Sequence, residues 1–412
     1  MSSITRRQAV TRILSASALA VPFARTEVFG IVLPKEEITP SERQQMAGVA
    51  DAFMRKFDVP GLSVAIAREG RIVYESPFGE VNRQAGQRLT VANLFRIASV
   101  TKPITSTAIF TLIERGKLRQ HDRVFGPGAV LGTKFGKGTF KKWVEEITID
   151  HLLTHTCGGW DNSGDDPMFE NVGMDHTQLI SWTLDTKPLK NVPGTHYAYS
   201  NFGYCVLGRV IEQITGRPYH EFVQQEILAR CGVRDMRISG NTLNQRLAEE
   251  VFYYGQGGEN PYDMNVTRMD SHGGWLATPR DLVLFLTHVD GFKSTPNILK
   301  PETIRLMTTA SAVNSGYARG WAVNSAPNCW HNGSLPGTIT IMVRTASGFC
   351  WAALTNTRTT GQPDMGLALD NMVWDMVHKV SAWKAWILSS GPGNSICYSS
   401  ACSDFCATTI LS

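Results

Sequence analysis

The sequence predicts an α/β fold in which both ends of the chain build one antiparallel sheet, flanked by helices, with a mainly helical domain inserted between them. Three observations support this prediction. Strand patterns lie near the start of the chain and return after residue 320. The segment between them alternates helical patterns with polar loops punctuated by glycine and proline. An amphipathic helix then follows the last strand pattern.

The first globular elements follow from apolar periodicity and turn residues. In chain order we expect a helix, two strands joined by a turn, a short extended segment and a second helix: Ser41–Phe57, Leu62–Ala67, Ile72–Glu75, Phe95–Ala98 and a helix ending at about Arg115. Gly116 stands where a helix stop is expected. From there to about residue 320 few runs resemble strands, so this part is predicted to be mainly helical.

The last globular elements are three strands and a helix: Gly320–Val323, Thr338–Val343, Cys350–Leu354 and about Met365–Val380. Cys329 and Cys350 are expected on neighbouring strands of the sheet. None of the eight cysteines forms a CxxC pair, so a zinc or thioredoxin-type site is poorly supported. Free buried cysteines are the simpler interpretation of most of them, and their pairing stays open.

The chain is predicted to have one globular domain, residues 42–382, between an export signal and a tail. Its sheet part covers about 42–100 and 320–382, and its helical part about 103–319. Residues 387–412 are rich in Ser, Gly and Cys without periodicity, and we expect them to be disordered.

The first 30 residues have the composition of an export signal. Arg6-Arg7 precedes the short apolar stretch Ile13–Ala24, a twin-arginine pattern that predicts a periplasmic or secreted protein. Arg12 keeps open the alternative of a disordered basic N-terminus. The composition of the whole 412-residue chain is that of a globular protein, with 42% hydrophobic and 18% charged residues and a net charge of +4. Neither a nucleic-acid partner nor an integral membrane span is expected.

Ser99-Val100-Thr101-Lys102 is the first candidate catalytic motif. Three residues apart at the start of a helix, the Ser99 and Lys102 side chains share one face. A lysine whose pKa is lowered by burial or nearby cations can remove the serine proton, and the helix start offers N–H groups to an oxyanion. Ser381-Ala382-Trp383-Lys384 has the same spacing, but lies too near the C-terminus to have partners downstream.

Two further motifs follow in order. Tyr199-Ser200-Asn201 is the only Tyr-x-Asn in the chain. Tyr199 can relay a proton as general base and acid if positive charge lowers its pKa, and the Asn201 amide can hold Lys102 and the substrate. For the third motif, His331-Asn332-Gly333 is favoured over His272-Gly273-Gly274, because strand signals flank it. Gly333 permits close approach, and the Ser334 N–H would be the second oxyanion donor beside that of Ser99.

With these motifs the chain resembles the class C β-lactamase-related serine hydrolases, in which Tyr-x-Asn takes the middle place. Five stretches carry the resemblance, which covers roughly residues 42–382: Phe95–Thr105 (FRIASVTKPIT), Ile147–Gly159 (ITIDHLLTHTCGG), Pro193–Gly208 (PGTHYAYSNFGYCVLG), Gly273–Phe285 and His331–Gly337 (HNGSLPG). The resemblance implies a β-lactamase/transpeptidase-like fold with the site between a sheet domain and a helical domain, and an acyl-enzyme mechanism without metal or other cofactor. It also assigns Gly273-Gly274 to a helix-entry segment, which demotes His272.

The chain departs from the true β-lactamases of this group in one motif, since it contains no Lys-Thr-Gly. A histidine at that place is a weaker, pH-dependent cation, which argues against recognition of a β-lactam carboxylate. Members with His-x-Gly resemble esterases, D-amino-acid peptidases and DD-peptidase-like enzymes. We therefore expect acyl transfer from an ester, amide or β-lactam-like carbonyl of a small-molecule or peptide substrate to water.

Other interpretations remain open for the same residues. Ser99 is alternatively a helix cap, Tyr199 a half-buried aromatic and His331 a structural histidine. The chain is alternatively a penicillin-binding or sensing module that acylates without turnover. A metallohydrolase on His151 and His155 is disfavoured, because a zincin would have Glu where Leu152 stands. A further set of residues is expected either in the substrate cleft or in the core: Trp160, Trp275 and Trp330.

Overall fold

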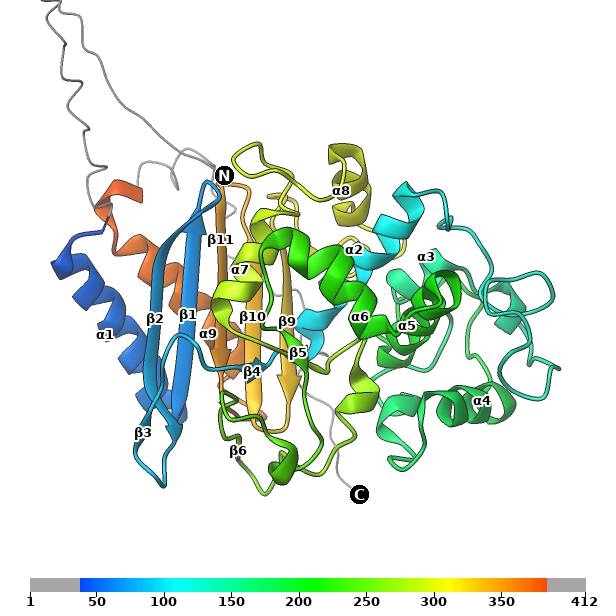
Figure 1. The fold of residues 1–412 in the computed structure, drawn as a ribbon, viewed down its shortest axis with the longest axis horizontal. Coiled ribbons are helices and arrows are strands. Elements are labelled where there is room, and N and C mark those ends of the chain that lie inside the picture. The colour runs from blue at the N-terminus through cyan, green and yellow to red at the C-terminus, as the bar shows by residue number, and fades with distance from the viewer. Residues whose placement is uncertain (1–37, 384–412) are drawn as a thin grey trace, which may run out of the picture. The chain divides into compact units, whose positions relative to one another are not determined.

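The computed structural model describes residues 38–383 of the 412, and the predicted export signal and tail lie outside this range. Its main feature is a seven-stranded sheet with the order β3-β2-β1-β11-β10-β9-β8 (Figure 1). The strands are β1 Gly61–Arg68, β2 Arg71–Asn82, β3 Gln87–Arg88, β8 Ala322–Val323, β9 Cys329–Leu335, β10 Thr338–Arg344 and β11 Phe349–Thr355. β1 pairs antiparallel with β11 from Leu62↔Thr355 to Arg68↔Phe349, so both ends of the chain share one sheet, as predicted.

Helices cover both faces of the sheet. α1 (Pro40–Phe57) and α9 (Met365–His378) pack together on one face, where alternate β1 residues such as Val64 and Ile66 join their core. α7 (Pro279–Thr287) packs against β1 and β11 on the other face. Because side chains alternate along a strand, each buried strand contributes to both cores. α7 therefore belongs to the sheet layers, although it lies in the range expected for the helical part.

α1 illustrates how the sequence sets a helix boundary. The Thr39 hydroxyl accepts from the Glu42 N–H at 3.2 Å, while the Glu42 carboxylate accepts from the Thr39 N–H at 2.9 Å. This capping box and Pro40 in the first turn define the start. The helix ends at Phe57, and the next residue, Asp58, has a left-handed φ of 49°.

The inserted region carries the other α-helices and short strands, and most of these helices are seen on the right of Figure 1. The helices are α2 Thr101–Glu114, α3 Ile149–Leu153, α4 His176–Thr186, α5 Asn201–Thr215, α6 Tyr219–Val223 and α8 Pro301–Thr308. The short strands are β4 Phe95–Arg96, β5 Arg237–Ile238, β6 Tyr254–Gly255 and β7 Trp275–Ala277, with β12 Thr357–Arg358 pairing to β6 from the C-terminal part. α2 is buried on nearly every side, because it lies between the sheet layers and the helical region.

Three expectations need correction. β2 runs to Asn82, well beyond the expected end at Glu75. The sequence pattern missed this extension because most residues after Glu75 are half-buried and show no clear alternation of buried and exposed positions. Cys329 and Cys350 are not on neighbouring strands, since β10 lies between β9 and β11. Among the described residues these two cysteines, like Cys157, Cys205 and Cys231, are free and buried. Gly273-Gly274 leads into β7 first, and α7 begins only afterwards.

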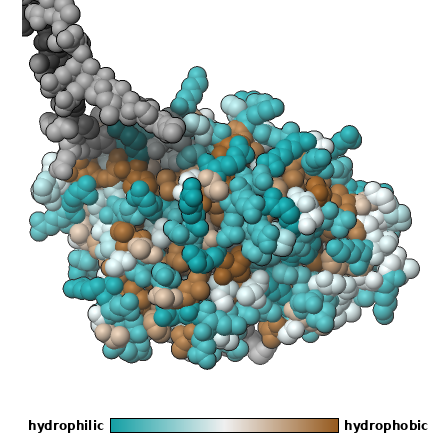
Figure 2. Space-filling model, in the orientation of Figure 1, coloured by the Kyte–Doolittle hydropathy of each residue, from teal (hydrophilic) through white to brown (hydrophobic). Residues whose placement is uncertain are grey.

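On the face shown in Figure 2, hydrophilic residues predominate and hydrophobic ones are scattered among them. The large apolar side chains are gathered in the cores on either side of the sheet. Within residues 38–383 no helix combines the length and the hydropathy that a bilayer crossing needs.

Candidate active site

Ser99, the expected nucleophile, lies in a single 3-10 turn, Ala98–Val100, that runs directly into α2. Ala98 has a φ of 48°, a conformation that residues other than glycine rarely adopt. Gly333 of β9 packs against this turn: a Cβ there would lie 2.3 Å from the Ile97 carbonyl oxygen and 3.0 Å from the Ala98 Cβ. The strand approaches the Ser99 turn this closely only because residue 333 has no side chain.

The Lys102 side chain is completely buried one helical turn after Ser99. Its nitrogen lies 2.9 Å from Ser99 Oγ, 2.7 Å from Asn201 Oδ1 and 3.1 Å from the His272 carbonyl oxygen. Burial lowers the pKa of Lys102 well below its usual value, and the nearby Asp166 carboxyl opposes this effect. The expectation of a lysine neutralised by burial agrees with this environment, and no nearby cation is needed for it.

The three contacts of Lys102 leave one direction of its nitrogen pointing at the Ser99 hydroxyl. The amide oxygen of Asn201 and the carbonyl oxygen of His272 can only accept, so they take the two N–H bonds. The third contact is with Ser99 Oγ, which accepts from Lys102 when the amine is protonated and can donate to its lone pair when the amine is neutral. His272 thus contributes its backbone to the site, although its ring had been considered and set aside from the sequence.

Tyr199 lies beside this pair, with the Lys102 nitrogen 4.7 Å from the centre of its ring. Burial raises the pKa of Tyr199 above its usual value, and a side-chain hydrogen bond with Ser99 opposes this only in part. The lowered pKa expected for Tyr199 is therefore wrong. It depended on neighbouring positive charge, whereas burial is the larger influence on Tyr199 and also disfavours the charged form of Lys102. In this environment Tyr199 is a protonated hydroxyl rather than a phenolate.

Asn201 is held in place by a carboxyl that the sequence analysis missed. Asp166 accepts from the Asn201 N–H at 2.6 Å and from the Phe202 N–H at 3.3 Å, at the start of α5. It also accepts from the Met168 N–H at 3.1 Å. Burial raises the pKa of Asp166 to about 7, despite these hydrogen bonds. The only signal in the sequence is Asp166-Pro167, which is common at ordinary helix starts.

Asn162 is a second missed residue of the same loop. Its N–H donates to the Tyr199 carbonyl oxygen at 2.7 Å, and its Oδ1 accepts from Asn201 Nδ2 at 3.0 Å. The second contact fixes the orientation of the Asn201 amide, because its NH₂ group faces Asn162 and its oxygen faces Lys102. The loop and the Tyr-x-Asn motif therefore position each other, a long-range relation that no local pattern encodes.

His331 lies in a chain of hydrogen bonds whose direction can be assigned. Its Nδ1 is 2.6 Å from the Asn332 carbonyl oxygen, which can only accept, so Nδ1 carries a proton. At the other end, the Ser200 N–H donates to His155 Nδ1 at 3.1 Å, which leaves the His155 proton on Nε2. The Tyr317 hydroxyl is 3.1 Å from Nε2 of both rings. It accepts from His155, and donates to a neutral His331.

This chain changes the role expected for His331. Burial lowers the pKa of His331 to about 3, so its ring is neutral rather than a pH-dependent cation. The ring lies on the same side of β9 as Gly333, whereas Asn332 and Ser334 line the cavity, since side chains alternate along a strand. His331 therefore joins the second and third motifs through Tyr317, another residue that the sequence analysis missed.

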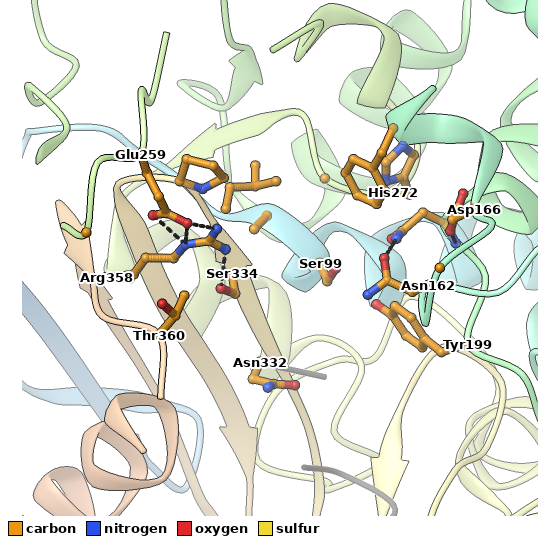
Figure 3. A pocket seen from close by; sticks show the side chains of 18 of the residues that line it. Ser99, Asn162, Asp166, Tyr199, Glu259, His272, Asn332, Ser334, Arg358 and Thr360 are labelled. Carbon is orange, nitrogen blue, oxygen red and sulfur yellow. Dashed lines mark hydrogen bonds and ion pairs between the residues drawn. The ribbon is translucent and has the colours of Figure 1, made fainter. Parts of the chain in front are cut away.

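A cavity of about 560 Å³ opens in front of Ser99. Figure 3 shows Tyr199, Asn162 and Asp166 on one side of Ser99, and Ser334 with the Arg358–Glu259 ion pair on the other. The predicted residues that line it are Ser99, Tyr199, Asn201 and Ser334, while the structure adds Asn162, Asp166, Glu259, His272, Asn332 and Arg358. The predicted site residues are thus gathered at one place, from segments more than 200 residues apart.

The remaining candidates have structural contacts. Trp160, Trp275 and Trp330 are buried in the cores and do not line the cavity. His151 closes a capping box with Thr148 at the start of α3. In the part of the chain from residue 38 to 383, no three or more His, Cys, Asp or Glu side chains gather in a way that would hold a metal ion.

Comparison with known families matches residues 46–370 to the Beta-lactamase family. Esterase EstB of Burkholderia gladioli is 32% identical over 207 residues, which cover 46% of this chain and half of the esterase's own length. Penicillin-binding protein 4 of Amycolatopsis lactamdurans is 26% identical over 330 residues, 74% of this chain and 83% of that protein.

The fold is also that of solved structures. The D-amino acid amidase from Ochrobactrum anthropi SV3, in complex with D-phenylalanine, superposes with a TM-score of 0.66 at 20% sequence identity. The superposition covers 82% of this chain and 99% of the amidase. At this level of identity the likeness concerns the arrangement of sheet and helices.

Proposed function

The chain belongs to the Beta-lactamase family and is a serine hydrolase, and we propose that it cleaves ester or amide carbonyl compounds through an acyl-enzyme on Ser99. The observation that carries this proposal is the contact set of Lys102, whose buried nitrogen lies 2.9 Å from Ser99 Oγ. A serine hydroxyl is a poor nucleophile until a base takes its proton. A neutral amine at hydrogen-bond distance, with both N–H bonds already engaged, is such a base.

Acylation begins when Ser99 Oγ attacks the substrate carbonyl carbon and its proton passes to Lys102. Negative charge then develops on the carbonyl oxygen, and the proposed donors to it are the backbone N–H groups of Ser99 and Ser334. The N–H of Ser99 lies in the first turn of a helical segment, where such groups have no partner within the helix. The bond to the leaving group breaks as the tetrahedral intermediate collapses.

Tyr199 returns the proton to the leaving group. Its hydroxyl is protonated and hydrogen bonded with Ser99, so it can give its proton to the departing oxygen or nitrogen while the proton on Lys102 replaces it. Asn201 keeps Lys102 aligned and is itself held by Asn162 and Asp166. For deacylation, water attacks the acyl carbon while Tyr199 and Lys102 take its proton and pass it back to Ser99 Oγ. The acyl–oxygen bond then breaks and the Ser99 hydroxyl is restored.

The substrate class rests on the relatives as well as on the site. Their names describe an esterase, a penicillin-binding protein and a D-amino acid amidase, which all bind or cleave carbonyl compounds. The neutral His331 leaves the third motif without the positive charge that would attract a β-lactam carboxylate. These observations favour esters and amides over β-lactams as substrates.

Intact-mass measurement after exposure to a fluorophosphonate and to a β-lactam tests the proposal. We expect the wild type to gain one fluorophosphonate adduct and Ser99→Ala to gain none. Ser106→Ala is the matched control, because Ser106 lies on the same helix but donates to the Arg319 carbonyl oxygen at 2.6 Å. This variant should still be labelled.

The outcomes separate the alternatives. The nucleophile assignment is wrong if Ser99→Ala gains the same adduct as the wild type. A stable β-lactam adduct, with no turnover of short-chain esters or D-amino-acid amides, would instead identify a penicillin-binding or sensing module. Turnover of an ester that Ser99→Ala abolishes would support the hydrolase.

A further inference from the structure

The cavity ends, on the side of Ser99 away from Asp166, in an ion pair between Arg358 and Glu259 (Figure 3). Arg358 Nε lies 3.0 Å from each carboxylate oxygen of Glu259, and Nη2 makes a further contact with the same group. Arg358 Nη1 donates to Ser334 Oγ at 2.9 Å. The guanidinium is therefore engaged on one edge by a carboxylate and on the other by the third motif.

The backbone places the two partners together. Arg358 is in β12 and pairs with Gly255 of β6, and the segment after Gly255 turns back sharply to Glu259. A Cβ on Gly255 would lie 1.9 Å from the Glu259 carbonyl oxygen, so this turn requires glycine. The Gln256 side chain fastens the turn, because it donates to the Phe57 carbonyl oxygen and to Thr357 Oγ1, each at 3.1 Å.

The pair leaves this end of the cavity without net charge. Arg358 is the only arginine or lysine side chain among the described residues that line the cavity, and its partner already occupies it. The other charged lining residues are carboxyl groups, Asp166 and Glu170. A substrate carboxylate would have to displace Glu259 or approach it against like-charge repulsion, whereas an uncharged group meets neither penalty.

We propose that Glu259 neutralises Arg358 and thereby makes this end of the cavity select substrates with an uncharged group there over substrates with a carboxylate. The inference rests on the proposed function and narrows its substrate class to neutral esters and amides. Selection works through an unfavourable contact with the wrong substrate rather than through a new favourable contact with the right one.

The test compares two pairs of esters whose members differ by one carboxylate. The first pair, 4-nitrophenyl butyrate and the 4-nitrophenyl monoester of succinate, places the carboxylate on the acyl side. The second pair, phenyl acetate and 4-acetoxybenzoate, places it on the leaving group. In Glu259→Gln, Arg358 keeps its charge without a counter-ion, so the ratio of kcat/KM for the carboxylate ester to that for the neutral ester should rise about tenfold in at least one pair.

Two variants serve as controls. Glu170→Gln also removes a carboxylate from the cavity lining, but Glu170 pairs with Lys187 instead of Arg358, so the ratio should stay at the wild-type value. Glu259→Gln combined with Arg358→Gln should return the ratio to near the wild-type value. If Glu259→Gln does not fold, Arg358→Gln alone tests the same point, because an unpaired Glu259 should lower the ratio.

An unchanged ratio in Glu259→Gln, or an equal rise in Glu170→Gln, would overturn the inference. These results are distinct from a failure of the proposed function. If Ser99→Ala still turns over the neutral esters, the proposed nucleophile is wrong. If Ser99 is required and the ratio does not respond to Glu259, only the selectivity inference is wrong.

Discussion

The two ends of the cavity differ in whether a basic side chain has a bonded carboxylate partner. Beside Ser99, Lys102 is completely buried, with two oxygen acceptors and a hydroxyl as its direct partners and no directly bonded carboxylate. At the other end, the Arg358 and Glu259 side chains are 15% and 21% exposed and bond to each other. Burial without a bonded counter-ion disfavours a charge, whereas a bonded counter-ion at a partly hydrated site preserves it.

The difference shows how one cavity can hold the base for the reaction at one end and the groups that select the substrate at the other. A lysine must be neutral to accept a proton, so burial that disfavours its charged form suits Lys102 to act as the base. Selection against a substrate carboxylate needs a charged Glu259, and its ion pair with Arg358 keeps both groups charged at the other end of the cavity. The predictions below test the reactive end, which carries the larger effects.

The largest effect is expected for Lys102→Met, which keeps the length of the side chain and removes the base. The kcat/KM for a neutral ester should fall about 10³-fold or more, because Ser99 loses its proton acceptor. Steady-state kinetics measure this, with Lys134→Met as the control, since Lys134 is exposed on the surface. A loss of less than about tenfold would mean that another group takes the Ser99 proton.

Tyr199→Phe is expected to have the next largest effect. It removes the hydroxyl that we propose returns the proton, so kcat should fall about 10²-fold or more while KM changes little. A 4-nitrophenyl ester releases a leaving group that needs little protonation, so Tyr199→Phe should slow its hydrolysis less than that of an amide. Equal losses for both substrates would argue against a role for Tyr199 in protonating the leaving group.

Asp166→Asn should shift the pH dependence of the reaction. The Asp166 carboxyl raises the pKa of Lys102, so its removal favours the neutral amine. Lys102 is the active base above its own pKa, and the acidic limb of the kcat/KM profile should therefore move to lower pH. Asp165→Asn is the matched control, because Asp165 pairs with Lys190 and should leave the limb in place. A limb unchanged in Asp166→Asn would show that Asp166 does not act on Lys102 electrostatically.

Tyr317→Phe should have the smallest effect on rate and a measurable one on stability. It leaves His155 Nε2 without its hydrogen-bond acceptor and His331 Nε2 without its donor. We expect a loss of about 1–3 kcal/mol in the free energy of unfolding, measured with urea. The ratio of carboxylate to neutral ester turnover should not change, since His331 carries no charge. A change in that ratio would indicate that the His331 ring acts on substrate charge.

Much of the fold could be predicted from the sequence because its strong patterns are local. The helical spacing of Ser41–Phe57 comes from the one buried face of α1, and the run Leu62–Ala67 comes from a strand that is buried on both faces. Both elements lie within a residue or two of the predicted bounds. The order of the strands in the sheet was harder to predict from the sequence. That β10 separates Cys329 from Cys350 depends on pairing between distant segments, which single strands do not specify.

The sequence by itself determined which residues are candidates for the reaction. Ser99, Lys102, Tyr199 and Asn201 stand in two short motifs, and each motif can be found in the sequence because its residues lie together at the start of one helix. The choice of Ser99 over Ser381 came from the order of the motifs, and that of His331 over His272 from the strand signals that flank His331.

Only the tertiary structure decided the pKa values of these residues and which other side chains contact them. Burial lowers the pKa of Lys102 and of His331 and raises that of Tyr199, and burial depends on every segment packed around the site. Asp166, Glu259 and Arg358 reach the cavity from segments that carry no motif. A pKa and an ion pair are set by what surrounds a group in space, and a sequence records only what surrounds it along the chain.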